Sequence, residues 1–444
     1  MRKFVVGARL APVFGLAAAT AVGLAAEAHA SGFQLKEQSA EGLGNAFAGS
    51  TAKAKDLSTI FFNPAGMTAL SGHQSQAVVS YIIPRAEFRA DSATLGVAGT
   101  PPLSGARTQG DAINDAVVPA AYAMYDHTDR VKFGLAINVP FGLVTDYDDD
   151  WVGRYHALKS DLQTIAIQPS IAYKVNDWLS VGGGPVFQYA SAELTKAVDV
   201  GALGGAPGTL ALDGKSKVTG DDLAVGYTLG VMLQPLETTR VGLSYRSAIS
   251  HNLQGDVKFT NMGAAAANPN FRDGSGSAKL NLPATASVGV YHEVNDQLAL
   301  MADVSWTQWS DFRELSVFRA GDPAGVPLSS TNEDWDDTWF TSIGATYKPM
   351  DKLNLQIGLA YDQSPVPDAT RTPRVPDADR TWLAVGAGYE FMPGVTTNLS
   401  YTHIWVDSAR IDLHNEGGGL PEHNVSGSYD SAIDIISAEV VVKF

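Results

Sequence analysis

The sequence contains no cysteine in its 444 residues, and it has fewer basic than acidic side chains. The lack of cysteine excludes a disulfide-stapled scaffold and any thiolate-ligated metal site. The formal net charge of −16 at pH 7 opposes binding to phosphate backbones, so no nucleic-acid partner is expected.

Signatures of catalysis are also missing. There is no G-x-S-x-G or H-E-x-x-H motif, and the nine histidines lack the spacing of metal ligands. The stretch GTLALDGKS, residues 208–216, has five residues between its glycines, one too many for a phosphate loop. The sequence therefore predicts no enzyme, no cofactor and no metal site. Acidic runs at residues 148–150 and 333–337 are interpreted as solvated loop charge, with divalent-ion binding beside lipopolysaccharide as the alternative.

Only one long apolar run is present, at residues 10–26. It follows the basic residues Arg2, Lys3 and Arg9, and it precedes an A-x-A pattern that ends at Ala30. This arrangement predicts a secretory signal peptide over residues 1–30. The alternative is a membrane anchor, which the shortness of the run and its interruption by Pro12 disfavour.

Beyond residue 72 the dominant pattern has a period of two. In KLNLQIGLAYD, residues 352–362, apolar side chains alternate with small or polar ones, and VKFGLAINVPF, residues 131–141, repeats this. Such alternation fits either a soluble sandwich with an apolar core or a membrane barrel whose apolar face meets lipid.

The lengths of the connections favour the barrel. Six short turns are expected, at residues 126–130, 175–177, 234–237, 294–296, 348–352 and 392–394. Seven long polar or Gly/Pro-rich loops alternate with them, at residues 89–117, 145–161, 195–221, 256–277, 320–337, 363–380 and 407–431. Short turns on one rim and long loops on the other are typical of outer-membrane barrels. We therefore predict an all-β fold, a 14-stranded antiparallel transmembrane β-barrel over residues 73–444, in contact with outer-membrane lipid and lipopolysaccharide.

The chain ends on an alternating stretch, AIDIISAEVVVKF, whose last residue is Phe444. A terminal aromatic on such a strand resembles the signal that the outer-membrane assembly machinery reads. The sequence therefore predicts a bacterial outer-membrane location.

Residues 31–72 do not follow the strand pattern, although they contain several large apolar side chains. A barrel of this size leaves a lumen, so a compact segment before the first strand is expected to fill it as a hatch. The alternative is a loose periplasmic tail, which the apolar residues disfavour.

Several motifs resemble the FadL family of outer-membrane transporters for long-chain fatty acids and hydrophobic compounds. They are S-G-F-Q-L at residues 31–35, G-L-G-x-A-x-x-G at 42–49 and N-P-A-G at 63–66. Further similar blocks lie at residues 148–162, 241–255, 282–294, 305–315 and 376–391. The resemblance thus extends through most of the chain.

The resemblance implies that the start of the hatch reaches the ligand site and that a kink in the third strand opens the barrel wall laterally. The corresponding hatch residues are Ser31, Gly32, Phe33, Gln34, Asn63, Pro64 and Ala65, and those of the third strand are Asn138, Pro140, Phe141 and Gly142. Proline cannot donate a ladder bond and glycine permits positive φ, so the residues themselves also predict a break there. An ordinary strand end at the outer rim is the alternative.

The expected function is diffusion of long-chain fatty acids through apolar sites and out of a lateral opening, with small aromatic hydrocarbons as alternative substrates. The carboxylate needs a cationic donor. The candidates are Arg154, Lys159, Arg246, Arg371, Arg374 and Arg380. An enzyme built on Ser247 and His251 is disfavoured, because residues four apart on a strand lie about 13 Å apart. An open porin is disfavoured by the hatch.

Overall fold

The structure, a computed structural model, describes residues 32–96, 102–414 and 422–444. The predicted signal peptide and Ser31 lie outside the described residues.

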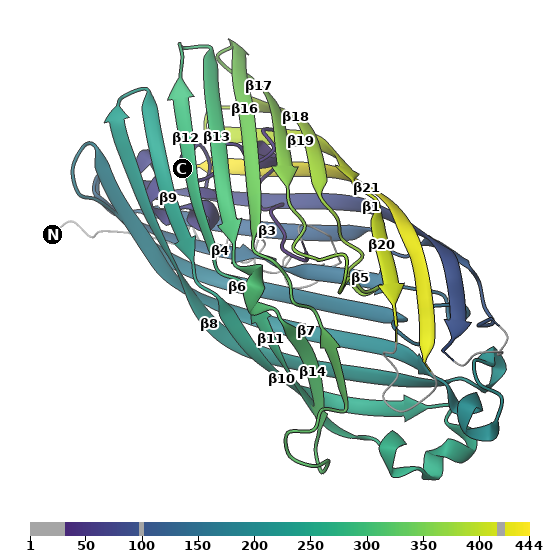
Figure 1. Ribbon diagram of the computed structural model, residues 1–444. Coiled ribbons are helices and arrows are strands. Elements are labelled where there is room, and N and C mark those ends of the chain that lie inside the picture. The colour runs from purple at the N-terminus through teal and green to yellow at the C-terminus, as the bar shows by residue number, and fades with distance from the viewer. Residues whose placement is uncertain (1–31, 97–101, 415–421) are drawn as a thin grey trace.

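The described strands form one closed antiparallel barrel (Figure 1). Its strand segments are β1 (Gln74–Leu95), β2 (Thr108–Asp111), β3 (Ala116–Asp126), β4 (Val131–Asn138), β5 (Gly142–Asp146), β6 (Lys159–Lys174), β7 (Leu179–Val198), β8 (Gly214–Leu236), β9 (Thr239–Arg246), β10 (Ile249–Thr260), β11 (Gly274–Leu282), β12 (Thr285–Glu293), β13 (Leu298–Thr307), β14 (Glu314–Arg319), β15 (Ser329–Asn332), β16 (Thr338–Met350), β17 (Leu353–Asp362), β18 (Arg380–Met392), β19 (Val395–Val406), β20 (Ala409–Leu413) and β21 (His423–Lys443). Among the described residues, seven barrel strands consist of two segments each, namely β2/β3, β4/β5, β9/β10, β11/β12, β13/β14, β15/β16 and β19/β20. The 21 segments therefore make fourteen strands, which confirms the predicted architecture.

The barrel is closed by its first and last strands. β1 pairs with β21 along nearly its whole length, from Gln74 opposite Lys443 to Leu95 opposite His423. Because both edges are used, the sheet keeps no long free edge at this seam.

Alternation along the strands separates an apolar outside from a polar inside. On β17 the side chains of Leu355, Ile357 and Leu359 are 42%, 52% and 48% exposed, whereas that of Gln356 is only 4% exposed. The inward positions of other strands likewise carry buried polar groups, such as Gln168, Asp303 and Asn398. This arrangement suits a barrel that meets lipid outside and encloses a polar lumen.

The strands on the long-loop side extend further than the sequence indicates. β1 continues to Leu95, and β7 and β8 leave only residues 199–213 between them. The predicted loops at 89–117 and 195–221 are therefore partly strand, because ladders such as Val198 opposite Gly214 continue there. Polar composition alone does not end a strand whose backbone groups are paired.

Helices are short. They are α2 (Ala40–Leu43), α3 (Thr59–Phe62), η1 (Pro64–Ala69), η2 (Val200–Gly204), η3 (Leu210–Leu212), η4 (Gly263–Ala267), η5 (Pro269–Phe271) and η6 (Trp309–Asp311). None of the helices in the described ranges is both long and apolar enough to cross a membrane.

The first described residues, 32–72, lie inside the ring of strands and are called the N-terminal segment below (Figure 1). α2 contacts β18, β19 and β21, while η1 contacts β6, β7 and β8 on another part of the wall. Most of its side chains are buried, including Leu43, Phe47 and Ile60. The segment therefore occupies the lumen.

Candidate functional site

The N-terminal segment is shaped by local hydrogen bonds rather than by long helices. Ser39 caps α2 and accepts from Gly42 N, and Asn63 accepts from Ala65 N at the start of η1, where Pro64 takes the first position. The side chain of Asn63 also donates to the carbonyl of Thr51 at 2.7 Å and to that of Val231 on β8 at 3.0 Å. The N-P-A motif thus ties the segment to itself and to the wall.

Two buried carboxylates on the barrel wall hold the segment. Glu439 on β21 accepts from the backbone N–H of Ala40 at 2.8 Å and from Asn398 Nδ2 at 2.7 Å. Asp303 on β13 accepts from the backbone N–H of Thr51 at 2.9 Å and from its hydroxyl at 3.1 Å. Neither residue is among those predicted from the sequence. An acidic residue at an inward position of an alternating strand could have indicated a contact of this kind.

Glycines on the wall allow the close approach. A Cβ on Gly242 would lie 1.9 Å from the carbonyl oxygen of Thr51, and one on Gly358 would lie 2.1 Å from the backbone of Asn45. Any side chain at these positions would push the N-terminal segment away from the wall.

Phe33 sits in a cage of aromatic side chains. Its ring lies 4.8 Å from that of Trp309, 5.4 Å from that of Trp335 and 5.7 Å from that of Phe312, measured between centroids. Gly32 precedes it with φ +60°, and its N–H donates to Asp377 Oδ2 at 2.9 Å. The Phe33 side chain is only 2% exposed.

The chain around Phe33 is paired with the third barrel strand. Gly142 N donates to the Phe33 carbonyl at 2.9 Å, and Leu35 N donates to the Pro140 carbonyl at 2.9 Å. These bonds flank an antiparallel bridge between Gln34 and Phe141. Backbone groups that a regular neighbour would use are therefore satisfied by the N-terminal segment.

The third strand is interrupted at this point. β4 ends at Asn138, β5 begins at Gly142, and the register against β6 shifts by one residue, from Asn138 opposite Ala166 to Gly142 opposite Gln163. Within the described residues, the ladder between β3 and β4 stops at Ala121, and β5 pairs only with β6. The wall between β5 and the first half of β3 therefore lacks a backbone ladder.

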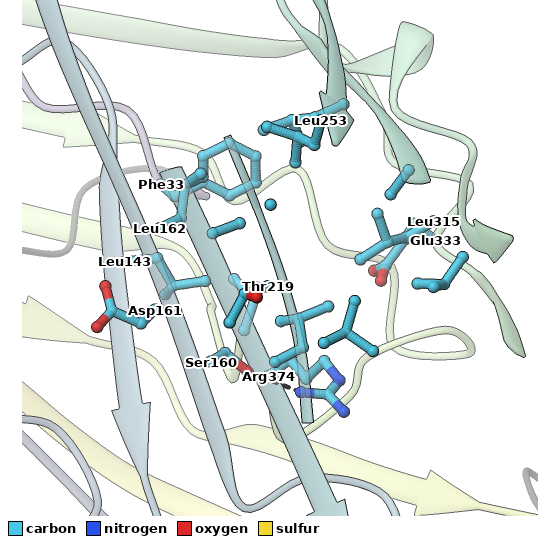
Figure 2. Close-up of a pocket in the computed structure, with 18 of the residues that line it drawn as sticks. Phe33, Leu143, Ser160, Asp161, Leu162, Thr219, Leu253, Leu315, Glu333 and Arg374 are labelled. Carbon is cyan, nitrogen blue, oxygen red and sulfur yellow. Dashed lines mark hydrogen bonds between the residues drawn. The ribbon is translucent and has the colours of Figure 1, made fainter. Parts of the chain in front are cut away.

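A mostly apolar pocket of about 80 Å³ lies beside Phe33. Figure 2 shows Leu143 and Leu162 among the side chains between Phe33 and Arg374, with Leu253 beyond Phe33 on the side away from Arg374. Arg374 donates to Ser160 Oγ at 3.0 Å and to the His156 carbonyl at 3.0 Å. We call this space the Phe33 pocket.

A larger cavity of about 790 Å³ adjoins the Phe33 pocket on the long-loop side. Its lining includes the apolar side chains of Leu203 in η2, Phe259 near the end of β10 and Phe271 in η5. Leu194, Val218, Leu315, Val317 and Arg374 border both spaces. The two cavities therefore adjoin each other, with Arg374 at their boundary. The lining of the larger one also includes charged side chains, such as those of Lys196 and Asp322.

The other cationic candidates lie elsewhere. Arg154 pairs with Asp213 at 2.6 Å, and Arg371 pairs with Asp368 at 2.6 Å. Arg380 donates to Asp377 through Nε at 3.1 Å, and Lys159 pairs with Asp161 at 3.0 Å. The fifth, Arg246, borders a separate cavity on the other side of residues 34–36.

The remaining predicted residues have structural partners. Asn138 Nδ2 donates to the Tyr122 hydroxyl at 2.9 Å, and Ala65 N donates to Asn63 Oδ1 at 3.2 Å. Ser247 and His251 are not brought together as a catalytic pair, since the His251 ring bonds Asp222 and Gln188. In the described part of the chain, no group of three potential ligands could hold a metal ion.

Burial changes the proton affinity of two side chains in the N-terminal segment. It raises the pKa of the Glu37 carboxyl from 4.5 to about 7, against smaller opposing effects of Arg380 and Lys36. It lowers the pKa of the Lys36 ammonium, while Asp362, Asp303 and Glu37 act in the opposite direction.

A barrel with these features defines a bacterial outer-membrane protein that crosses the membrane with its strands. Residues 21–444 match the family described as outer membrane protein transport protein (OMPP1/FadL/TodX), and the chain belongs to this family. The resemblance seen in the sequence and the predicted outer-membrane location are thereby confirmed.

Individual relatives are consistent with this family assignment. The chain is 30% identical to a long-chain fatty acid transport protein of Escherichia coli O157:H7 over 433 residues, covering 90% of this chain and 93% of that protein. The crystal structure of a Pseudomonas aeruginosa FadL homologue superposes with a TM-score of 0.83 at 27% identity, covering 93% of this chain and 100% of the other. The Pseudomonas putida toluene transporter TodX shares the fold, with a TM-score of 0.64 at 16% identity over 87% of this chain and 94% of its own.

Proposed function

We propose that this protein takes up long-chain fatty acids across the outer membrane by diffusion and is not an enzyme. The observation that carries the proposal is the pairing of Phe33, which borders the apolar pocket, with residues 140–142, where the barrel wall is interrupted. The E. coli relative described as a fatty acid transporter supports the substrate class.

The route begins in the large loop cavity and continues to the Phe33 pocket. An acyl chain gains roughly 0.8 kcal/mol per CH₂ group buried, so it prefers these walls to water. Arg374 at the boundary would hold the carboxylate while the tail enters between Leu143, Leu162 and Leu253. Arg374 is therefore the proposed carboxylate ligand, in preference to Arg154, Arg371, Arg380 and Lys159.

Residues 31–72 act as the hatch in this proposal. A tail that needs the space of the Phe33 ring displaces it and breaks the two hydrogen bonds that join residues 33 and 35 to the third strand. The gap beside β5 then opens toward the membrane, where the tail gains a second apolar environment. Lipid, lipopolysaccharide and the assembly machinery are the proposed surroundings of the barrel wall and of the terminal Phe444.

Small aromatic hydrocarbons remain the second candidate, because the Phe33 pocket is small and most of its lining is apolar. Such a molecule would use the same route but would not need Arg374 as a ligand, because it has no carboxylate.

Uptake of labelled oleate and labelled toluene, in a host without its own transporter, tests the proposal. We expect Phe33→Ala and Gly142→Val to abolish oleate uptake, because the first removes the trigger and the second places a side chain 3.2 Å from Leu35 Cδ1. Phe133→Ala on the lipid-facing side of β4 and Gly110→Val, which has open space around it, are the matched controls. If the protein takes up toluene but not oleate, its substrates are hydrocarbons rather than fatty acids. If it takes up neither compound, the proposal is overturned.

A further inference from the structure

A second cavity lies on the other side of the chain that carries Phe33. It measures about 60 Å³ and is bordered by Gln34, Leu35 and Lys36 of the N-terminal segment. Phe33 itself borders only the first pocket, so residues 33–36 form a wall between the two spaces. We call the second space the Lys36 cavity.

Two cationic side chains line the Lys36 cavity. Lys36 Nζ lies 4.2 Å from the ring centroid of Phe340, and the Arg246 guanidinium lies 4.3 Å from that of Phe61. Arg246 also donates to the Phe61 carbonyl at 3.1 Å and to Gln168 Oε1 at 2.8 Å. These partners are neutral, so they orient the two cations without cancelling their charge.

The carboxyl groups of Asp362, Asp303 and Glu37 act on the Lys36 ammonium from a distance. Among the described residues, no carboxylate lies within 4.0 Å of the Lys36 ammonium or the Arg246 guanidinium. Asp303 is the one carboxylate that the described lining of this cavity contains, and both of its oxygens accept from Thr51. Asp362 faces Arg380 across the ladder between β17 and β18, and burial raises the pKa of the Glu37 carboxyl to about 7.

The rest of the lining suits a small amphipathic group. Phe47, Phe62 and Phe340 supply apolar walls, while Ser287, Ser305 and Thr285 supply hydroxyls. A space of about 60 Å³ accepts a group the size of a few water molecules, which fits a carboxylate and excludes a phospholipid head group.

We propose that the Lys36 cavity is a second binding site for the fatty-acid carboxylate, which Lys36 and Arg246 hold after the wall of residues 33–36 has moved. The site rests on the proposed function and deepens it. The head group leaves Arg374 and is received by Lys36 and Arg246 while the tail moves toward the gap at residues 138–142. Without a second cation, the carboxylate would have to leave its first ligand for an uncompensated apolar path.

The test compares an anionic with a neutral substrate. Lys36→Met keeps the apolar stem of the side chain but removes the charge, and it is expected to slow oleate uptake about tenfold. Uptake of oleyl alcohol, which carries no charge, should be unchanged. Lys36→Arg should restore oleate uptake, and Lys352→Met in the exposed turn between β16 and β17 is the matched control.

Equilibrium binding of oleate to the protein in lipid nanodiscs gives a second readout. The Lys36→Met variant is expected to keep wild-type affinity, because Arg374 and the Phe33 pocket are unaltered. Equal slowing of oleate and oleyl alcohol, or no slowing of either, would overturn the second site. Failure of the wild-type protein to take up oleate would instead overturn the proposed function.

Discussion

Glu37 is a single residue whose ionisation bears on how firmly the N-terminal segment is held. Its carboxyl group is buried, and neither oxygen has a hydrogen-bond partner among the described residues. Because burial raises its pKa from 4.5 to about 7, the folded protein favours the protonated acid. Ionisation of the buried Glu37 carboxyl therefore lowers the free energy of unfolding. The loss begins as the pH rises above 4.5, and above pH 7 it amounts to about 3 kcal/mol.

Glu37→Gln should therefore stabilise the protein at pH 8 and leave it unchanged at pH 4. The measurement is hydrogen exchange of the backbone amides of residues 36–44 at both pH values, corrected for intrinsic rates. Equal protection in variant and wild type at pH 8 would contradict the assigned proton affinity.

Individual residues also show which parts of the candidate site could be predicted from the sequence and which could not. Phe33, Pro140 and Gly142 could be named, because a motif and the backbone limits of proline and glycine mark them. The wall carboxylates Asp303 and Glu439 and the cation Lys36 could not, since their role depends on which side chain faces them across the lumen. The same dependence separates Arg374, which borders both cavities, from Arg154 and Arg371, which are not among the described lining residues of either.

Among the elements, α2 begins at a buried contact with the barrel wall. Its first N–H groups are satisfied by Glu439 on β21, in a setting without solvent. Replacing Glu439 with Gln leaves a buried neutral acceptor, which weakens the contact by roughly 1.4 kcal/mol.

We therefore expect Glu439→Gln to raise the frequency of ion-conducting openings in planar lipid bilayers by about tenfold. Glu87→Gln, at an exposed position of β1, is the matched control. Conductance identical to that of the wild type would show that this contact does not hold the segment in the lumen.

The strands show where periodicity is informative. The alternation in β4 and β17 predicts their positions and their lipid-facing sides, because a pleated strand alternates its side chains. The outer parts of β7 and β8 show only weak alternation, because few apolar residues, such as Leu194 and Val218, stand among polar ones there. Their pairing is a property of two neighbouring segments, which a single stretch of sequence does not show.

For the whole molecule, a closed barrel and a filled lumen leave a substrate two exits, past the N-terminal segment or through the wall. Asp303 and Glu439 contact the N-terminal segment from two different strands, so its complete removal would break both contacts. Movement of residues 33–36 alone would leave both contacts in place and break the two bonds to residues 140 and 142, together with the bonds of the Gln34 side chain to Thr285 and Thr307. The lateral exit therefore requires the smaller rearrangement.

A reversible cross-link between Gln34→Cys and Phe141→Cys tests whether residues 33–36 must leave the third strand for the substrate to exit. Gln34 and Phe141 lie opposite each other in an antiparallel bridge. The hydrogen bonds of the bridge are made by their chain neighbours, so Gln34 and Phe141 are a non-hydrogen-bonded pair. Such pairs hold their Cα atoms about 4.5 Å apart, within the range of a disulfide. The natural chain has no cysteine, so the engineered bond would be the only one.

Oleate uptake is measured in cells with the bond oxidised and after its reduction, with the two single-cysteine variants as controls. We expect uptake to stop in the oxidised protein and to return on reduction, because the substrate cannot leave while residues 34 and 141 stay joined. Undiminished uptake by a fully cross-linked protein would contradict it.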